Sequence, residues 1–167
     1  LGDVYKRQDL KSISAAGGYG MSVVTALVAQ NTQGVRSVHV PPVDFLQEQR
    51  DAGSEEGERD AVKIGMLADA AITAKVADFL RRLPDDVPVV LDPVMVATSG
   101  DRLLEREAEQ AVRDLCSQVD LITPNLKELA VLTQTDEAGD LEQAIATAKE
   151  WAKGAGTAVV VKGGHLD

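Results

Sequence analysis

The sequence predicts an α/β fold in which a mostly parallel sheet carries helices on both of its faces. From residue 61 onward, short apolar segments alternate with longer segments of helical periodicity, an alternation typical of parallel β-α units. The central apolar segment, 87–91, is rich in valine, as are strands that are buried on both faces. The chain's 167 residues suffice for one domain with a substantial core.

Residues 1–60 predict shorter and less regular elements. Segment 1–8 fits neither a helical nor a strand pattern. Leu10 and Ile13 share one helical face, and the glycines that follow favour a left-handed cap at the helix end. The predicted elements are a helix over 9–16, strands over 21–30 and 35–40, a helix over 43–50, and an acidic loop or frayed helix end over 51–60.

Residues 61–167 show the clearest periodicity. Ile72, Val76 and Phe79 follow the 3.6-residue period of an amphipathic helix, which Pro84 ends. Apolar residues at the same spacing predict three further helices, and valine-rich or isoleucine-containing runs predict the strands between them. The predicted strands are 61–65, 87–91, 119–123 and 157–161, and the predicted helices are 66–83, 103–118, 125–132 and 140–154.

Charge and composition exclude several classes of partner. A net charge of −10 and a pI of about 4.6 argue against binding to nucleic-acid backbones or anionic membranes. Aromatic residues make up only 3% of the chain, so base-stacking surfaces are not expected. No apolar run is long enough to span a bilayer, and no secretory leader is visible. The single cysteine, Cys116, fits a cytoplasmic protein, and we expect it to be buried on a helix.

Polar residues follow several predicted strands at their carboxyl ends. Gln30 ends the first strand, Asp92 ends the central one, Asn125 and Glu128 follow the next, and Lys162 ends the last. In open parallel sheets ligands bind outside this edge, so we expect the four strand ends to meet there. Each residue also has a structural interpretation: Asp92 as a helix cap, Gln30 in a turn, Asn125 with Glu128 as a capping box, and Lys162 in a surface loop.

Taken together, these residue types fit phosphoryl transfer. Carboxylates hold a metal ion, a lysine before two glycines offers a cation and free amides to a phosphate, and amide side chains suit an uncharged ring. His39 is expected on a strand surface, and His165 lies near the possible phosphate loop but has no visible partner. The sequence contains no zinc-ligand spacing, no P-loop and no dinucleotide-binding glycine fingerprint.

A series of motifs in these segments resembles one enzyme family in the same order. They are DLK at 9–11, GYG at 18–20, TALVAQNT at 25–32, KIGML at 63–67, DPVMVA at 92–97, SGD at 99–101, LITPNL at 121–126 and KGGH at 162–165. Together they resemble the hydroxymethylpyrimidine/phosphomethylpyrimidine kinases of thiamine biosynthesis, members of the ribokinase-like superfamily. The resemblance implies a three-layer ribokinase-like fold. It also implies ATP- and Mg²⁺-dependent phosphorylation of 4-amino-5-hydroxymethyl-2-methylpyrimidine and then of its monophosphate.

The resemblance also implies roles for individual residues. Five residues match the family's pyrimidine pocket: Gln30, Asp9, Val28, Met66 and Val94. Four residues match its ATP and phosphate site: Asp92, Asn125, Glu128 and Lys162. Within that second set, Asp92 and Glu128 resemble the magnesium network.

The sequence departs from the family pattern in three places. Residues 1–8 do not resemble the family's opening strand and glycine-rich loop, so we expect a non-matching segment followed by a partial kinase domain over 9–167. Segment 52–59 lacks apolar positions that the family usually has. The catalytic Cys or Asp base is expected beyond Asp167, and Cys116 does not match it. The chain by itself is therefore expected to be inactive.

Two other functions stay open at this point. A pyridoxal kinase shares the superfamily, although the AQNT and KIGML motifs favour the thiamine enzyme. A non-catalytic pyrimidine-binding module would retain the pocket and lack ATP turnover. The oligomeric state, a homodimer included, is also open.

Overall fold

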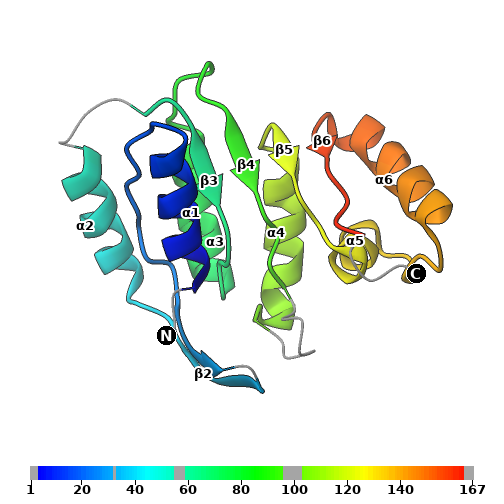
Figure 1. Ribbon diagram of the computed structural model, residues 1–167, viewed down its shortest axis with the longest axis horizontal. Helices are drawn as coiled ribbons and strands as arrows, with labels where there is room; N and C mark the ends of the chain where they lie inside the picture. The colour runs from blue at the N-terminus through cyan, green and yellow to red at the C-terminus, as the bar shows by residue number, and fades with distance from the viewer. Residues whose placement is uncertain (1–3, 32, 55–58, 96–102, 164–167) are drawn as a thin grey trace. The chain divides into compact units, whose positions relative to one another are not determined.

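The computed structural model describes residues 4–31, 33–54, 59–95 and 103–163 (Figure 1). The chain divides into two compact units, 1–58 and 59–167. In the described part of the chain, none of the helices combines the length and the apolar character needed to cross a membrane.

The N-terminal unit contains two helices and a two-stranded antiparallel sheet. Its elements are α1 (Val4–Ala15), β1 (Leu27–Asn31), β2 (Gly34–His39) and α2 (Val43–Ser54). In the β1–β2 register Val28 lies opposite Val38, and the register shifts between Ala29 and Gln30, where Arg36 of β2 has no paired residue in β1. The predicted second strand and the helix after Pro42 are confirmed, and that helix extends into the segment expected to be irregular.

Helix α1 begins earlier than the sequence predicts. The expectation of an irregular segment is wrong for Val4–Gln8, which form one continuous helix with the residues that follow. The predicted end is confirmed: the helix stops at Ala15, and Gly17 takes a φ of +86°, a conformation that favours glycine.

The strand predicted over 21–30 is wrong in its first half, because only Leu27–Asn31 form β1. The Gln49 side chain of α2 accepts a hydrogen bond from the Val24 N–H at 2.9 Å and donates to the Val24 carbonyl at 3.2 Å. One amide side chain thus takes the place of a neighbouring strand at this residue, so the backbone is satisfied without entering a sheet.

The C-terminal unit is a parallel sheet with the predicted alternation of strands and helices. Its strands lie in the order β3-β4-β5-β6, every pair is parallel, and the predicted α/β class is confirmed. Helix α3 contacts α4, α4 contacts α5, and α5 contacts α6, which makes one row of helices along the sheet (Figure 1). The elements are β3 (Val62–Ile64), α3 (Ala70–Leu80), β4 (Val89–Leu91), the 3₁₀ turn η1 (Arg106–Ala108), α4 (Glu109–Cys116), β5 (Leu121–Ile122), α5 (Leu126–Thr133), α6 (Leu141–Ala155) and β6 (Ala158–Val159).

Several of these elements are shorter than predicted, because side-chain caps and loops occupy their ends. Helix α3 begins at Ala70 rather than at residue 66, since the Asp69 carboxylate accepts the Ile72 N–H at 2.8 Å as an N-cap. Ala68, in the preceding loop, has a φ of +62°, which no helix allows. The segment predicted as one helix over 103–118 contains η1 before α4.

The core of the C-terminal unit lies between the sheet and its helices. Ile72 of α3, Leu91 of β4, Leu115 of α4 and Ile122 of β5 are fully buried. Cys116 is also fully buried, as predicted, and burial raises the pKa of its thiol to about 12. The thiol is therefore a packing residue rather than a nucleophile.

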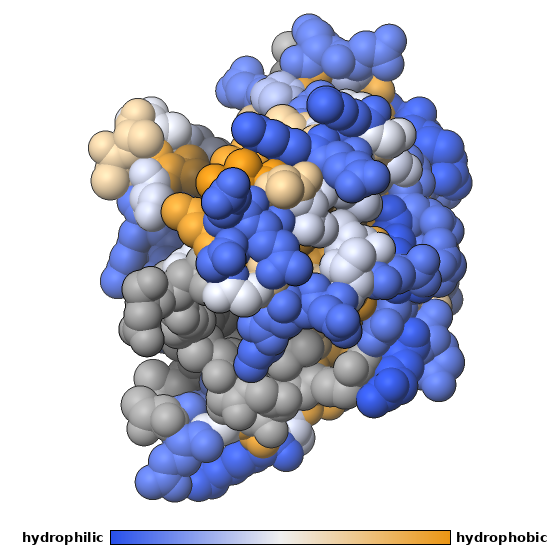
Figure 2. Space-filling model, turned by 90° about the vertical axis from the view of Figure 1, so that its right-hand side faces the viewer, coloured by the Kyte–Doolittle hydropathy of each residue, from blue (hydrophilic) through white to orange (hydrophobic). Residues whose placement is uncertain are grey.

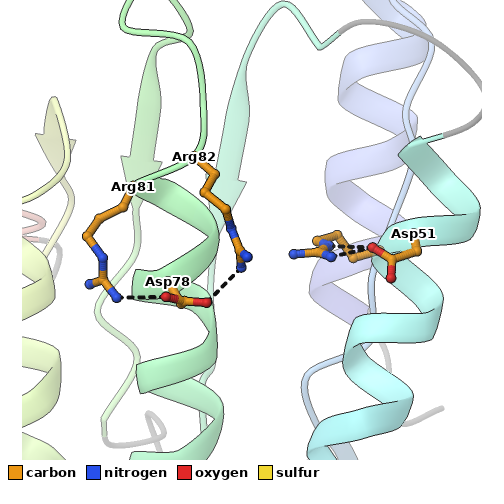
Figure 3. A network of polar contacts seen from close by, with 5 residues as sticks. Asp51, Asp78, Arg81 and Arg82 are labelled. Atoms are coloured by element: carbon orange, nitrogen blue, oxygen red, sulfur yellow. Dashed lines mark hydrogen bonds and ion pairs between the residues drawn. The ribbon is translucent and has the colours of Figure 1, made fainter.

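The surface of this unit carries local charge pairs. Asp78 of α3 binds Arg81 at 2.9 Å and Arg82 at 2.7 Å (Figure 3). The Arg81 hydrogen bond and then the Arg82 charge lower the pKa of the Asp78 carboxyl. Figure 3 also shows a charge pair of the N-terminal unit, formed by Arg50 and its neighbour Asp51 in α2. Hydrophilic residues cover most of the side that Figure 2 shows, with a small apolar group among them.

Candidate functional site

Three neighbouring strands of the parallel sheet end in polar residues that meet at one edge. Asp92 follows β4, Asn125 lies beyond β5 and Lys162 lies beyond β6. The Asn125–Lys162 pair continues the parallel ladder past the two strands, and the Lys162 N–H donates to the Pro124 carbonyl at 2.8 Å. The Asp92 N–H donates to the Ile64 carbonyl at 2.8 Å, which fixes the backbone that carries the Asp92 carboxylate. The predicted meeting of these strand ends is confirmed.

Lys162 and Asp92 form an ion pair across this edge. The Lys162 Nζ atom lies 2.7 Å from Asp92 Oδ1 and 3.9 Å from Glu128 Oε2. The side chains of Lys162 and Asp92 are 43% and 24% exposed, whereas that of Glu128 is only 2% exposed. One ammonium group therefore faces two carboxylates, one open to solvent and one buried.

Glu128 joins the loops that follow β4 and β5. Its Oε2 atom accepts the Asn125 N–H at 2.8 Å, and its Oε1 atom accepts the Met95 N–H at 3.4 Å. In return, the Asn125 side chain accepts the Glu128 N–H at 2.8 Å, so the predicted capping box at the start of α5 is confirmed. A side chain that the sequence identifies as a helix cap is thus also the buried acid of this cluster.

The electrostatics of Glu128 reflect its position. Burial is the largest influence and raises the pKa of the carboxyl, and the neighbouring Asp92 charge acts in the same direction. The Asn125 N–H, the Lys162 charge and the Met95 N–H oppose this rise. The net direction is upward, so the cluster favours a proton on Glu128 or another positive charge beside it.

The donor set fits a magnesium ion in kind, though only with ligands from outside the chain. Among the described residues, no group of three or more His, Cys, Asp or Glu side chains gathers as a metal site. Magnesium commonly takes one or two protein carboxylates together with water and substrate phosphates. Asp92 is the partly exposed carboxylate, and both oxygens of Glu128 already accept N–H groups. Asp92 is thus the better placed direct ligand, and the two-residue set remains a prediction.

Two apolar residues predicted for the ring pocket lie beyond neighbouring strands. Met66 follows β3 and Val94 follows β4, and both are half-buried. The Val94 N–H donates to the Asp92 carbonyl at 2.8 Å in a tight turn. Since β3 and β4 are parallel neighbours, both residues lie toward the same edge of the sheet as Asp92. Their contact with a ligand stays a prediction.

The other three predicted pocket residues belong to the N-terminal unit. Asp9 lies on α1, and Val28 and Gln30 lie on β1. The expectation that Gln30 ends a strand of the parallel sheet is wrong, because β1 pairs with β2 in a separate antiparallel sheet. Val28 and Gln30 do share the less exposed face of β1, as residues two apart on a strand must.

A shallow depression lies on the β1–β2 hairpin. His39 is exposed there, as predicted for a strand surface. The lining residues are Leu27, Val28, Ala29, Gln30, Asn31, Arg36, Ser37 and His39. The roles of Gln30, Val28 and Asp9 as ligand contacts remain predictions.

Sequence reasoning missed one group at the site and one at the opposite edge of the sheet. The Met95 N–H holds Glu128, and no sequence signal marks a backbone donor of this kind. The Asp120 carboxylate accepts the Val89 N–H at 2.7 Å and so fixes the start of β4 against β5. An acid directly before a short apolar run was the available signal for Asp120. The predicted positions Ser99, Gly164 and His165 lie outside the described residues.

Comparisons with known proteins identify relatives of the chain. The family model for phosphomethylpyrimidine kinase matches residues 7–167. The chain is 55% identical over 158 residues to the thiamine biosynthesis multifunctional protein ThiED of Corynebacterium efficiens, covering 95% of this chain and 21% of that protein. It is 47% identical over 161 residues to the hydroxymethylpyrimidine/phosphomethylpyrimidine kinase of Escherichia coli, covering 95% of this chain and 60% of that protein. The chain thus spans from about a fifth to three fifths of these relatives.

Solved structures show the same fold. A phosphomethylpyrimidine kinase of Clostridium difficile has a TM-score of 0.83 at 35% identity, covering 97% of this chain and 70% of that one. A pyridoxal kinase of Staphylococcus aureus in complex with AMP-PCP has a TM-score of 0.80 at 27% identity, covering 97% of this chain and 59% of that one.

Proposed function

Because the chain belongs to the phosphomethylpyrimidine kinase family, we propose that its protein transfers phosphate from ATP to 4-amino-5-hydroxymethyl-2-methylpyrimidine and to its monophosphate, in thiamine biosynthesis. The observation that carries the proposal is the Lys162, Asp92 and Glu128 cluster at the carboxyl edge of the sheet. Such an edge is where open α/β sheets bind ligands, and this cluster offers the charges that phosphoryl transfer needs.

Each residue of the cluster has a distinct task in this reaction. Lys162 binds an ATP phosphate oxygen and neutralises charge on the transferring group. Asn125 is the N-cap of α5 and fixes the backbone at the start of that helix. Glu128 holds the loop after β4 and the loop after β5 together through the N–H groups of Met95 and Asn125. Asp92, with Glu128 behind it, would hold Mg²⁺, which supplies charge neutralisation between phosphates when bound.

The family motif assigns roles toward the pyrimidine ring to five residues, three in the N-terminal unit and two in the C-terminal unit. Gln30 hydrogen-bonds the uncharged pyrimidine, and Asp9 binds a polar group of the same substrate. Val28 in the N-terminal unit, and Met66 and Val94 in the C-terminal unit, are each proposed as apolar contacts of the ring. The side chains of Val28 and Gln30 share one face of β1, which supports a joint role. The catalytic base is expected beyond Asp167, so the reaction is proposed for the whole protein.

The test is a kinase assay on the whole protein with the pyrimidine alcohol, its monophosphate and pyridoxal as acceptors. We expect turnover of both pyrimidines, with pyridoxal slower. Lys162→Met should lower kcat by about 100-fold or more, as loss of a charge-stabilising donor does. Lys149→Met, an exposed lysine on α6, serves as the matched control and should leave turnover unchanged. Unchanged turnover in Lys162→Met would remove the cluster from the site.

Pyridoxal kinase is the second candidate, because the Staphylococcus aureus enzyme of that name shares the fold at 27% identity. Faster turnover of pyridoxal in the same assay would select it. Ligand binding without any ATP turnover would select a non-catalytic pyrimidine-binding module. We further propose a cytoplasmic location and no nucleic-acid or membrane partner, in line with the net charge of −10. Direct measurement of the mass in solution tests whether the protein forms a homodimer.

A further inference from the structure

Asp92, Glu128 and Lys162 form a cluster whose positive charge comes from the protein itself. The ammonium lies 2.7 Å from one carboxylate and 3.9 Å from the other. Asp92 and Glu128, the acids that would attract a divalent cation, therefore already face the positive charge of Lys162. A second cation that approaches Asp92 must either displace the ammonium or accept its repulsion.

We propose that the Lys162 ammonium competes with a divalent cation for the carboxylates of Asp92 and Glu128. The ammonium excludes the cation from this site until nucleotide phosphates bind the ammonium instead. The inference rests on the proposed function, since it assigns the nucleotide as the group that releases the lysine. It makes Lys162 a residue with two exclusive partners, a carboxylate in the absence of nucleotide and a phosphate in its presence.

The structure gives Lys162 both an anchor and freedom to move. Its backbone is held by the N–H bond to the Pro124 carbonyl and by the ladder pairing with Asn125. Its side chain is 43% exposed, so the ammonium can change partners by side-chain rotation while the backbone stays in place. The exchange thus requires no movement of the sheet.

The two carboxylates also differ in their burial and in their hydrogen bonds, so they are not equivalent as cation ligands. Glu128 has both oxygens engaged by backbone N–H groups and is almost fully buried, whereas Asp92 is partly open to solvent. The described residues bring no third acid, histidine or cysteine to this pair as a metal site. Without phosphate oxygens as further ligands, a divalent cation gains little that would offset the loss of the ion pair.

A coupling of this kind is reciprocal. If nucleotide strengthens cation binding by releasing Lys162, then the cation strengthens nucleotide binding by the same factor. Replacing the lysine by an uncharged side chain removes the competition. Cation binding should then no longer need the nucleotide.

The test measures Mn²⁺ binding to the protein by electron paramagnetic resonance, with no nucleotide present. We expect weak binding to the wild type and an affinity about tenfold higher in Lys162→Met, a size typical of coupling between sites. The gain should disappear in Lys162→Met/Asp92→Asn, and Lys149→Met should bind like the wild type. Circular dichroism establishes that each variant is folded, and Lys162→Gln replaces Lys162→Met if that variant is not.

Equal Mn²⁺ affinity in the wild type and Lys162→Met would overturn the inference, as would a gain that survives Asp92→Asn. A second series adds AMP-PCP, which should raise the affinity of the wild type for Mn²⁺ more than that of Lys162→Met. If AMP-PCP does not bind to any variant, the proposed kinase function fails, while the nucleotide-free series still decides whether Lys162 competes with the cation.

Discussion

Replacing Glu128 tests whether one buried carboxylate holds the two loops of the site together. Glu128→Ala leaves the N–H groups of Asn125 and Met95 without their acceptor, from bonds of 2.8 and 3.4 Å. A buried donor left unpaired costs about 1–3 kcal/mol, and the longer Met95 bond belongs at the low end of that range. Release of the carboxylate from burial offsets part of the loss. The two donors together cost about 2–4 kcal/mol, and with this offset we expect a destabilisation of about 1–3 kcal/mol.

Glu128→Gln separates the charge from the shape. It keeps the volume and one acceptor oxygen, so it should lose a single N–H bond and cost only about 1 kcal/mol. Urea unfolding followed by circular dichroism measures both variants, with equal m-values as the check that the unfolding transition is unchanged. A Glu128→Ala protein within about 0.5 kcal/mol of the wild type would refute the reasoning, since that is the range of ordinary surface substitutions.

The pH dependence of the same pair of proteins gives an independent check. Burial raises the pKa of Glu128 above its ordinary value of 4.5, so the folded state holds the proton more tightly than the unfolded state. The stability that this group adds is present below that value and is lost as the pH rises through the raised pKa. The advantage of the wild type over Glu128→Gln should therefore narrow as the pH rises above 4.5. A widening advantage would show that the pKa is lowered instead.

Three further changes test other parts of the structure. Asn125→Ala removes the N-cap of α5 and should cost about 1 kcal/mol in urea unfolding, while Asp140→Ala at the α6 N-cap, the control, should cost as much without altering kinase activity. Gln49→Ala removes both bonds to the Val24 backbone and should speed amide hydrogen exchange at Val24, and unchanged exchange would contradict that pairing. Cys116, with its thiol pKa raised to about 12, should react with a thiol reagent only on unfolding, and rapid labelling of the native protein would contradict its burial.

Local sequence patterns predicted the parts of the fold that depend on local interactions. The capping box follows from an asparagine and a glutamate three residues apart, and the structure forms it as predicted. The alternation after residue 61 predicted the parallel sheet, because each apolar run is too short for a helix and each amphipathic run too long for a strand. The strand-end positions of Asp92, Asn125 and Lys162 then followed from sheet geometry.

Errors arose where a distant side chain decides the local structure. The run before β1 has strand propensity, yet its backbone at Val24 is satisfied by Gln49, which lies 25 residues away in the sequence. Gln30 was placed on the parallel sheet because a strand ending in polar residues does not reveal its partner strand. The second role of Glu128 was equally hidden, since Met95 reaches it from 33 residues away.

The strand order β3-β4-β5-β6 has a consequence for how this part of the chain is built. Val62 pairs with Val89, Val90 with Leu121, and Leu121 with Ala158, so each strand joins the one that was synthesised before it. The paired residues lie 27, 31 and 37 positions apart in the sequence, and the entropic cost of closing loops of similar length differs little. Assembly can therefore proceed from the N-terminal side of this unit during translation, one β-α unit at a time.

Because each of these strands joins the sheet beside the strand that precedes it in the sequence, no strand has to insert between two that are already paired. Lys162 follows the last strand of this series, and its partner Asp92 follows a strand two positions earlier. The charged cluster can therefore close only after β6 has docked. The ion pair thus forms only after these four strands have joined, and time-resolved hydrogen exchange should show the β6 amides protected after those of β3, β4 and β5.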